Sequence, residues 1–279
     1  MARKKITIPD FAACKENGRR FTMITCYDYT IAKLIDKSPC EMILVGDSVG
    51  NMVYGYNGTI PVTMDQMVYA IQGVAAGAPN TFIVGDLPFG SYNQSCEQAI
   101  ASATRLIKEG GCDCVKLEGG IEMADKIEAI VKAGIPVMGH IGLTPQTVSA
   151  MGGMKVQGKS SAQADKLMED IKAIEKAGAF MCLIECVPKV VGEAMCDAVS
   201  IPVFAGGPCS KAMGQGQNFY DMMGFMGTFV PKFAKHYAEL EQTILDALSA
   251  FHQDCMDGAY PAQENFYDVY VPGYSDKNE

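Results

Sequence analysis

Val84-Gly85-Asp86-Leu87-Pro88 ends a short apolar run with a glycine, a carboxylate and a proline. Three further stretches follow a related pattern: Val45-Gly46-Asp47-Ser48, Lys116-Leu117-Glu118-Gly119-Gly120 and Ile184-Glu185-Cys186-Val187-Pro188. One acid at the end of a buried strand carries little information, but four at equivalent places predict a shared site where strand ends meet. Carboxylates gathered in one place repel each other, so they need a divalent cation, a proton or a cationic partner. The pattern therefore predicts metal-assisted chemistry.

Short apolar runs alternate with helix-like segments along the chain. We expect strands near residues 21–27, 42–47, 82–87, 114–118, 137–141, 181–186, 202–206 and 224–230. Nearly all of these runs are apolar throughout, as in parallel strands that are covered on both faces. Eight strand–helix alternations indicate a (β/α)8 TIM barrel. The alternative is an open doubly wound sheet, but no Gly-x-Gly-x-x-Gly turn follows an early strand.

The remaining segments fit around one such barrel, so we expect residues 1–279 to form a single domain. Residues 9–15 predict a short N-terminal helix that plugs the barrel bottom. Thr63-Met64-Asp65-Gln66 predicts a capping box that begins a helix. Residues 142–160 form a long connection of the kind that serves as a lid or binding loop. From Pro231 onward the apolar residues follow a helical period, and an aromatic tail follows that we expect to dock on its own or a neighbouring subunit.

Composition excludes several classes of partner. The formal net charge is −9 and the only basic run is Arg3-Lys4-Lys5, so nucleic acids and anionic membranes are poor partners. No apolar stretch approaches the roughly 18 residues that span a bilayer, and no apolar segment of a signal peptide follows the basic start. The chain has 11 cysteines without a Cys-x-x-Cys pair. We therefore expect a reduced, cytoplasmic protein.

Asp47 and Asp86 are the expected metal ligands. Oxygen donors favour Mg²⁺ or Mn²⁺ over zinc, and Mg²⁺ usually takes one or two protein carboxylates beside water and substrate. The alternative is that each aspartate only caps the turn that follows it.

Lys116 and Glu118 lie two residues apart on one expected strand, so both side chains point to the same face. If that face is the barrel interior, each group offsets the cost of burying the other. Lys116 then binds a substrate carboxylate or carbonyl, and Glu118 supports the metal directly or through water. The alternative is a purely structural ion pair.

Glu185 is expected to be a buried, unpaired carboxylate with a raised pKa, which suits a general base. The alternatives are that it caps a helix or pairs with Lys189. His140 follows the fifth apolar run and is expected either to hydrogen-bond a substrate oxygen or to be a satisfied core residue.

Several stretches of the chain resemble the ketopantoate hydroxymethyltransferase family, a member of the phosphoenolpyruvate mutase-like barrels. The resemblance runs from about residue 20 to about residue 245. The matching stretches are Thr25–Tyr29, Leu44–Ser48, Pro61–Thr63, Asp86–Phe89, Val115–Gly120, Gly139–Gln146, Lys155–Gly158, Glu185–Pro188 and Pro231–Lys235.

The resemblance implies transfer of a hydroxymethyl group from methylenetetrahydrofolate to 3-methyl-2-oxobutanoate, giving ketopantoate for pantothenate biosynthesis. It implies Mg²⁺ held by Asp47 and Asp86, with Glu118 as a further ligand. Glu185 would remove the C3 proton to form an enolate that Mg²⁺ stabilises. Ser48 and Lys116 would fix the oxo acid, in contact with Asp47, Asp86 and His140. The family is typically a decamer, which implies a homo-oligomer.

One region departs from the family pattern. Where the family has a glycine-rich turn after the seventh strand, this chain has Phe204-Ala205-Gly206-Gly207-Pro208-Cys209, and Met213 replaces an acid. Pro208 lacks an N–H and fixes φ, so this loop cannot copy the family's turn. A Gly-Gly-His before Pro-Lys-Phe is also replaced, by Gly227-Thr228-Phe229-Val230. These changes are expected to affect the reaction with the folate more than removal of the C3 proton.

Two alternatives to this function stay open. The chain is either another metal-dependent 2-oxo acid lyase or aldolase of the same barrel group, or a non-catalytic paralogue. The altered loop favours the former, and retention of the acids and Lys116 argues against the latter.

Overall fold

Eight short parallel strands pair in chain order, and the eighth pairs with the first to close a barrel. The structure, a computed structural model, describes residues 4–207, 209–225 and 232–275. The strands are β1 (Phe21–Thr25), β2 (Met42–Val45), β3 (Phe82–Asp86), β4 (Cys114–Glu118), β5 (Val137–Gly142), β6 (Met181–Glu185), β7 (Val203–Gly206) and β8 (Gly214–Gln217). Barrel closure confirms the (β/α)8 fold and excludes the open sheet.

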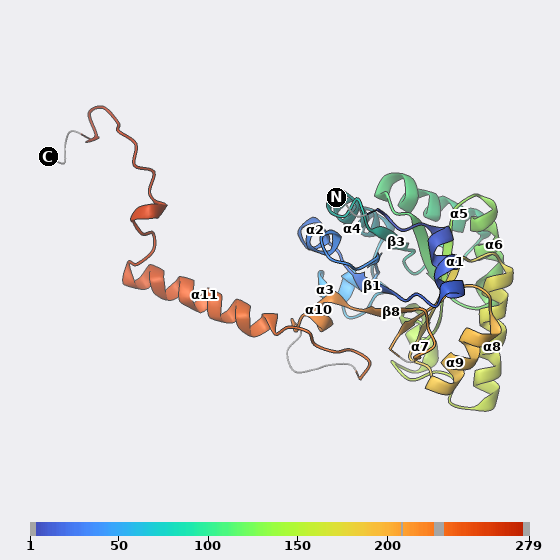
Figure 1. The fold of residues 1–279 in the computed structure, drawn as a ribbon. Coiled ribbons are helices and arrows are strands. Elements are labelled where there is room, and N and C mark those ends of the chain that lie inside the picture. The colour runs from blue at the N-terminus through green and yellow to red at the C-terminus, as the bar shows by residue number, and fades with distance from the viewer. Residues whose placement is uncertain (1–3, 208, 226–231, 276–279) are drawn as a thin grey trace.

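Most of the helices cover the outside of the barrel, whereas α1 closes one end and α11 extends away from it (Figure 1). They are α1 (Ile8–Asn17), α2 (Tyr29–Asp36), α3 (Val49–Met52), α4 (Met64–Gly77), α5 (Cys96–Arg105), α6 (Ala124–Lys132), α7 (Val148–Met151), α8 (Ser161–Lys176), α9 (Lys189–Ala198), α10 (Phe219–Met222) and α11 (Leu240–Asp257). A π-helical segment, η1 (Leu106–Gly110), extends α5, and single 3-10 turns occupy η2 (Ile121–Met123), η3 (Pro145–Thr147) and η4 (Gln263–Asn265). The capping box at Thr63 is present and begins α4 as predicted.

Helix α1 plugs the N-terminal end of the barrel, as the sequence predicts. The ring of Phe11 packs 4.9 Å from that of Phe21 and 5.2 Å from that of Phe82, between ring centroids. Phe21 and Phe82 are the first residues of their strands, so this contact seals the bottom. The accessible end of the barrel is therefore the one where the strands finish.

The prediction of an eighth strand near residues 224–230 is wrong. Strand β8 is Gly214-Gln215-Gly216-Gln217, which hydropathy does not reveal because it has no apolar side chain. A Cβ atom on Gly214 would lie 2.2 Å from Phe204 Cδ2, and one on Gly216 would lie 2.7 Å from Phe204 Cε1. The large ring on β7 thus takes the space that side chains of β8 would fill. Residues 226–230 lie outside the described residues.

The C-terminal helix also begins later than predicted, at Leu240 rather than near Pro231. Residue 231 lies outside the described part, and residues 232–239 are not helical. Helix α11 extends away from the barrel (Figure 1), and none of its residues is buried within the described chain. In the part of the chain that the structure describes, no helix combines the length and the apolar character that a membrane crossing requires.

Strand register places the ionisable residues next to each other. Asp86 on β3 pairs with Lys116 on β4, and Glu118 pairs with His140 on β5. Glu185 ends β6 opposite Gly142. Neighbouring residues in a parallel sheet share a face, so this register collects the polar side chains at one end of the barrel interior.

Candidate active site

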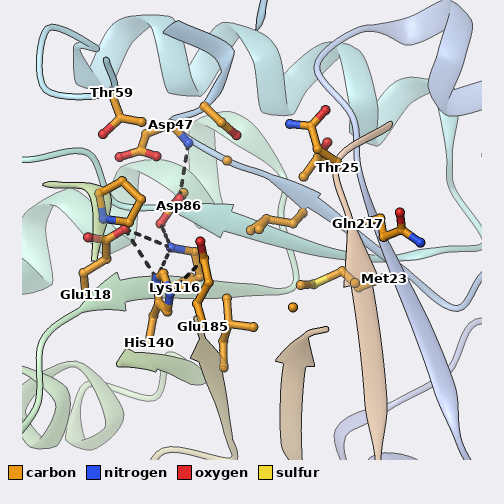
Figure 2. Close-up of a pocket in the computed structure, with 18 of the residues that line it drawn as sticks. Met23, Thr25, Asp47, Thr59, Asp86, Lys116, Glu118, His140, Glu185 and Gln217 are labelled. Carbon is orange, nitrogen blue, oxygen red and sulfur yellow. Dashed lines mark hydrogen bonds and ion pairs between the residues drawn. The ribbon is translucent and has the colours of Figure 1, made fainter. Parts of the chain in front are cut away.

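A cavity of about 270 Å³ lies at the end of the barrel where the strands finish. Every site residue that the sequence predicts lines it: Asp47, Ser48, Asp86, Lys116, Glu118, His140 and Glu185. Figure 2 shows the acids, the amine and the imidazole pointing toward one another from successive strands. The prediction that the four acid-bearing stretches share one site is therefore confirmed in its geometry.

Asp47 and Asp86 form an acidic pair. Asp47 lies two residues beyond β2, and its backbone N–H donates to Asp86 Oδ2 at 3.2 Å. Burial, followed by the charge of Asp86, raises the pKa of Asp47 to about 7, although Lys116 opposes the shift. Burial also raises the pKa of Asp86, again against Lys116. Burial thus disfavours the charged form of both carboxylates, and a further cation would offset that cost.

Lys116 is the internal counter-ion of the site. Its Nζ lies 2.7 Å from Asp86 Oδ1 and 3.9 Å from Glu118 Oε1. Burial lowers the pKa of Lys116, but the carboxylates of Asp86 and Glu118 outweigh burial and raise this pKa. Lys116 is therefore an ammonium ion that attracts anions rather than a base. The prediction that Lys116 and Glu118 share the interior face is confirmed.

His140 lies between two acids. Its Nδ1 is 3.4 Å from Glu118 Oε1, and its Nε2 is 3.3 Å from Glu185 Oε2. Burial and Lys116 lower the pKa of His140, but its interactions with the two glutamates outweigh them and raise it to about 9. Burial raises the pKa of Glu118, but His140, Lys116 and the backbone N–H of Gln146 together outweigh burial, so the pKa of Glu118 is lowered. The imidazole of His140 thus lies between Glu118, the expected further metal ligand, and Glu185, the expected base.

Glu185 differs from the prediction of a buried, unpaired carboxylate. Its side chain is 23% exposed, whereas those of Lys116 and Asp86 are 3% and 2% exposed. It faces His140, and Lys189 instead pairs with Glu193 at 3.7 Å. The sequence concealed this pairing because His140 is 45 positions away and meets Glu185 only across β5 and β6. Glu185 is the acid of the cluster that faces the open cavity.

Ser48 belongs to a chain of hydroxyl groups at the cavity wall. Its Oγ lies 2.8 Å from Tyr27 Oη, which accepts a hydrogen bond from Asn218 Nδ2 at 3.1 Å. Because Tyr27 accepts from Asn218, it can give its own hydrogen to Ser48. Ser48 then keeps its hydroxyl hydrogen for a ligand.

The donor set fits a divalent cation that prefers oxygen. Asp47, Asp86 and Glu118 offer carboxylate oxygens, and buried Asp86 Oδ1 has no hydrogen bond beyond its ion pair with Lys116. Among residues 4–207, 209–225 and 232–275, no group of three or more His, Cys, Asp or Glu side chains is arranged to hold a metal ion by itself. Mg²⁺ needs only one or two carboxylates and takes its other ligands from water and substrate. The acids therefore suit Mg²⁺ better than a metal that requires an all-protein shell.

Sequence reasoning missed two buried polar residues beside the acids. Gln146 Nε2 donates to Asp47 Oδ2 at 2.9 Å, and Tyr92 Oη donates to Gln146 Oε1 at 2.6 Å. Gln146 lies in the stretch Gly139–Gln146, where a polar side chain next to apolar residues was the available signal. Its partner Tyr92 lies in the loop after β3, so no local pattern joins the two.

The loop that departs from the family pattern borders the cavity. Gly206 and Phe233 line the wall, and Gln215 Nε2 donates to Cys209 O at 2.8 Å. Gln215 thus ties β8 to the loop after β7. Pro208, whose fixed φ is expected to alter this turn, lies outside the described residues, as do Phe229 and Val230.

Comparisons with known proteins identify relatives over nearly the whole chain. A sequence model of the family described as ketopantoate hydroxymethyltransferase matches residues 5–263. A 3-methyl-2-oxobutanoate hydroxymethyltransferase from Heliobacterium modesticaldum is 48% identical, with 95% of this chain and 96% of the relative covered. The protein of the same name from Clostridium beijerinckii is 47% identical over the same shares of the two chains.

Solved structures with the same fold are more distant in sequence. A phosphonopyruvate hydrolase in complex with oxalate and Mg²⁺ aligns with a TM-score of 0.59 at 14% identity, covering 93% of each chain. A 2,3-dimethylmalate lyase aligns with a TM-score of 0.57 at 12% identity, covering 94% of this chain and 92% of the lyase. At these identities the likeness concerns the fold alone.

Proposed function

The chain belongs to the ketopantoate hydroxymethyltransferase family, and on that premise we propose that its cavity carries out that family's reaction. A hydroxymethyl group passes from methylenetetrahydrofolate to C3 of 3-methyl-2-oxobutanoate, and the product is ketopantoate, used in pantothenate biosynthesis. The observation that carries this proposal is the convergence of Asp47, Asp86, Lys116, Glu118 and Glu185 on one cavity.

Asp47 and Asp86 are the residues that would hold Mg²⁺, with Glu118 as a further ligand through water. When bound, Mg²⁺ supplies a Lewis acid that withdraws electron density from the keto group of the oxo acid. The raised pKa values of both aspartates fit this assignment, because burial disfavours their charged forms and a bound cation would offset that cost.

Lys116, Ser48 and His140 bind and orient the oxo acid. The Lys116 ammonium attracts the substrate carboxylate, and the Ser48 hydroxyl donates a hydrogen bond to a substrate oxygen. The Nε2–H of His140, which faces Glu185, would be shared with an oxygen at the same polar end of the substrate. Because Lys116 and His140 are almost fully buried, both are held in place before the substrate arrives.

Glu185 removes the C3 proton. Its carboxylate is the exposed acid of the cluster, so it can reach a substrate carbon that the buried acids cannot. The proton passes to a Glu185 oxygen, and the electron pair of the C3–H bond stays on the substrate as an enolate. The enolate carbon then forms a bond to the one-carbon unit of the folate. One water supplies the oxygen of the new hydroxymethyl group, and tetrahydrofolate leaves. The contact between Glu185 Oε2 and His140 Nε2 orients the carboxylate during this step.

Hydrogen exchange tests the first half of this reaction without the folate. In heavy water with Mg²⁺, the protein should exchange the C3 hydrogen of 3-methyl-2-oxobutanoate, followed by proton NMR. Glu185→Gln should slow exchange about 10²- to 10⁴-fold, the usual contribution of a general base. Absence of exchange by the unaltered protein would instead favour a non-catalytic paralogue.

The altered loop favours one second candidate, a lyase or aldolase that forms the same enolate but uses another electrophile. This loop borders the cavity through Gly206 and carries Cys209, which Gln215 holds. Exchange at C3 without product on addition of methylenetetrahydrofolate would support this candidate. Formation of ketopantoate would exclude it.

We also propose that the protein is a homo-oligomer, namely a decamer as is typical of the family. Helix α11 would mediate a contact between copies. Along α11 the apolar side chains of Ile244, Leu248 and Phe251 are 40%, 59% and 56% exposed. Such a stripe on an otherwise polar helix needs a covering surface. Leu248→Glu should shift sedimentation toward smaller species, whereas Glu241→Gln on the same helix should not.

The proposed compartment is the cytoplasm. All 11 cysteines are unbridged in the structure, as a reducing environment would keep them.

A further inference from the structure

The amide of Gln146 touches two of the acids assigned to the cation. Gln146 lies in η3 after β5 and is 2% exposed. Its side-chain Nε2 donates to Asp47 Oδ2 and to Leu87 O, each at 2.9 Å. Its backbone N–H donates to Glu118 Oε2 at 3.0 Å. One residue thus contacts acids that come from opposite sides of β3.

The orientation of this amide is determined by its neighbours. Both acceptors around Nε2, Asp47 Oδ2 and Leu87 O, lack a hydrogen to give, so the NH₂ group must face them. The carbonyl Oε1 then faces Tyr92 Oη at 2.6 Å, and Tyr92 must be the donor there. Tyr92 is 1% exposed and also accepts from the backbone N–H of Glu118 at 3.2 Å. All polar groups of the Gln146 amide are therefore satisfied in one arrangement.

We propose that Gln146 is a positioning residue that sets Asp47 and Glu118 for the divalent cation, and that Tyr92 holds Gln146 in place. The hydrogen bond from the side chain of Gln146 to Asp47 Oδ2 restricts rotation of the Asp47 carboxylate. The hydrogen bond from its backbone N–H to Glu118 Oε2 restricts rotation of the Glu118 carboxylate. Hydrogen-bond partners of metal ligands act in this way, and their loss commonly weakens metal affinity. The proposal rests on the proposed function, because it takes Asp47 and Glu118 to serve the cation.

A purely structural role for Gln146 makes a different prediction. In that case the amide only satisfies Leu87 O, and its removal lowers stability without changing cation affinity per folded molecule. The chain contains a matched pair for comparison. Gln66 Nε2 donates to Tyr56 Oη at 2.7 Å, and neither residue lines the cavity. Gln66 also caps α4, so its replacement costs stability away from the acids.

The test is Mn²⁺ binding to the full chain, measured by electron paramagnetic resonance of free Mn²⁺ and scaled to folded protein by circular dichroism. Gln146→Met keeps the backbone N–H to Glu118 but removes the side-chain donors to Asp47 and Leu87 at similar volume, and it should weaken Mn²⁺ binding about 10- to 100-fold. Tyr92→Phe removes the hydrogen bond to Gln146 Oε1 and the one from the backbone N–H of Glu118, and it should weaken Mn²⁺ binding about 2- to 10-fold. Gln66→Met and Tyr56→Phe should leave Mn²⁺ affinity unchanged.

The outcomes separate this inference from the function on which it rests. Asp86→Asn should abolish binding, and a failure of the unaltered protein to bind Mn²⁺ would overturn the metal assignment and this inference together. The positioning role alone is overturned by one result: the unaltered protein binds Mn²⁺, Asp86→Asn does not, and Gln146→Met binds Mn²⁺ as tightly as the unaltered protein. Should Gln146→Met not fold, Tyr92→Phe decides, and unchanged affinity in that variant also overturns the role.

Discussion

The two halves of the barrel mouth differ in charge. Strands β3 to β6 contribute Asp86, Lys116, Glu118, His140 and Glu185 to the cavity, and Asp47 follows β2. The strand residues that β7, β8 and β1 contribute to it are uncharged: Phe204, Gly206, Gly216, Gln217, Met23 and Thr25. Asp221, in α10 after β8, also lines the cavity, so only the strand residues of this half, called the neutral half below, are uncharged. Figure 2 shows Met23, Thr25 and Gln217 apart from the ionisable group.

The difference indicates a division of labour within one cavity. Proton removal and binding of an anionic oxo acid need charge, and the charged half holds its groups by ion pairs that burial strengthens. The neutral half is suited to the apolar side chain of the substrate and borders the loop that departs from the family pattern. One half is therefore sensitive to lost charge, and the other to changed volume.

The largest expected effect comes from the counter-ion of the charged half. Lys116→Met removes the cation 2.7 Å from Asp86 and leaves buried acids without compensation. We expect the free energy of unfolding to fall by about 3–5 kcal/mol, as when one partner of a buried pair is lost. Urea unfolding should show part of this loss restored by Mg²⁺, which returns positive charge to the acids.

A surface ion pair of the same length is the control for Lys116→Met. Lys132 Nζ lies 2.7 Å from Glu128 Oε1, and the two side chains are 71% and 54% exposed. Lys132→Met should therefore cost less than about 1 kcal/mol. Equal costs for the two variants would contradict the view that burial makes the charged half sensitive.

The second expected effect concerns volume in the neutral half. Gly214→Ala places a Cβ 2.2 Å from Phe204 Cδ2 and should lower the free energy of unfolding by about 1–3 kcal/mol. Adding Phe204→Leu should relieve the clash. The double variant should therefore lose less free energy of unfolding than the two single variants lose in total. Gly73→Ala, whose Cβ would meet nothing closer than 3.5 Å in helix α4, should instead be stabilising. If the losses of unfolding free energy in Gly214→Ala and Phe204→Leu simply add in the double variant, the ring of Phe204 is not the cause of the destabilisation.

The third prediction sharpens the comparison through specificity. Met23→Ala enlarges the cavity in the neutral half. The kcat/KM for 3-methyl-2-oxopentanoate, which has one methylene more, should therefore rise about 10-fold relative to that for 3-methyl-2-oxobutanoate, the usual effect of one methylene. Competition between the two oxo acids measures the ratio. Met42→Ala, in the same inner core but not lining the cavity, should lower stability and leave the ratio unchanged.

The smallest expected effect lies at the boundary between the halves. Cys186 directly follows Glu185 and has a φ of 52°, in the left-handed region. Its carbonyl accepts from Gln157 N at 2.9 Å, which anchors the far end of the long loop after β5. Cys186→Val should lower the free energy of unfolding by about 1–2 kcal/mol relative to Cys186→Gly, because a left-handed backbone penalises a Cβ. Thermal unfolding that ranks the two variants equally would show that this turn is not strained.

Much of the charged half could be predicted from the sequence. An apolar run that ends in an acid is a local signal, and strands β2 to β6 lie within a few residues of their predicted ranges. The pair Lys116 and Glu118 was also readable, since two residues apart on a strand share a face. In the neutral half, the ranges of β1 and β7 were predicted about as well. Strand β8 was not, because it consists of glycine and glutamine and owes its shape to Phe204 on another strand.

The sequence by itself determined the barrel and the residues gathered at its mouth, because strand periodicity and strand-end acids are properties of neighbouring positions. Only the tertiary structure decided their partners: His140 for Glu185, Gln146 for Asp47, and Gly214-Gln215-Gly216-Gln217 as the closing strand. These pairings depend on strand register and on closure of the ring, which join positions far apart in the chain. No local pattern carries that information.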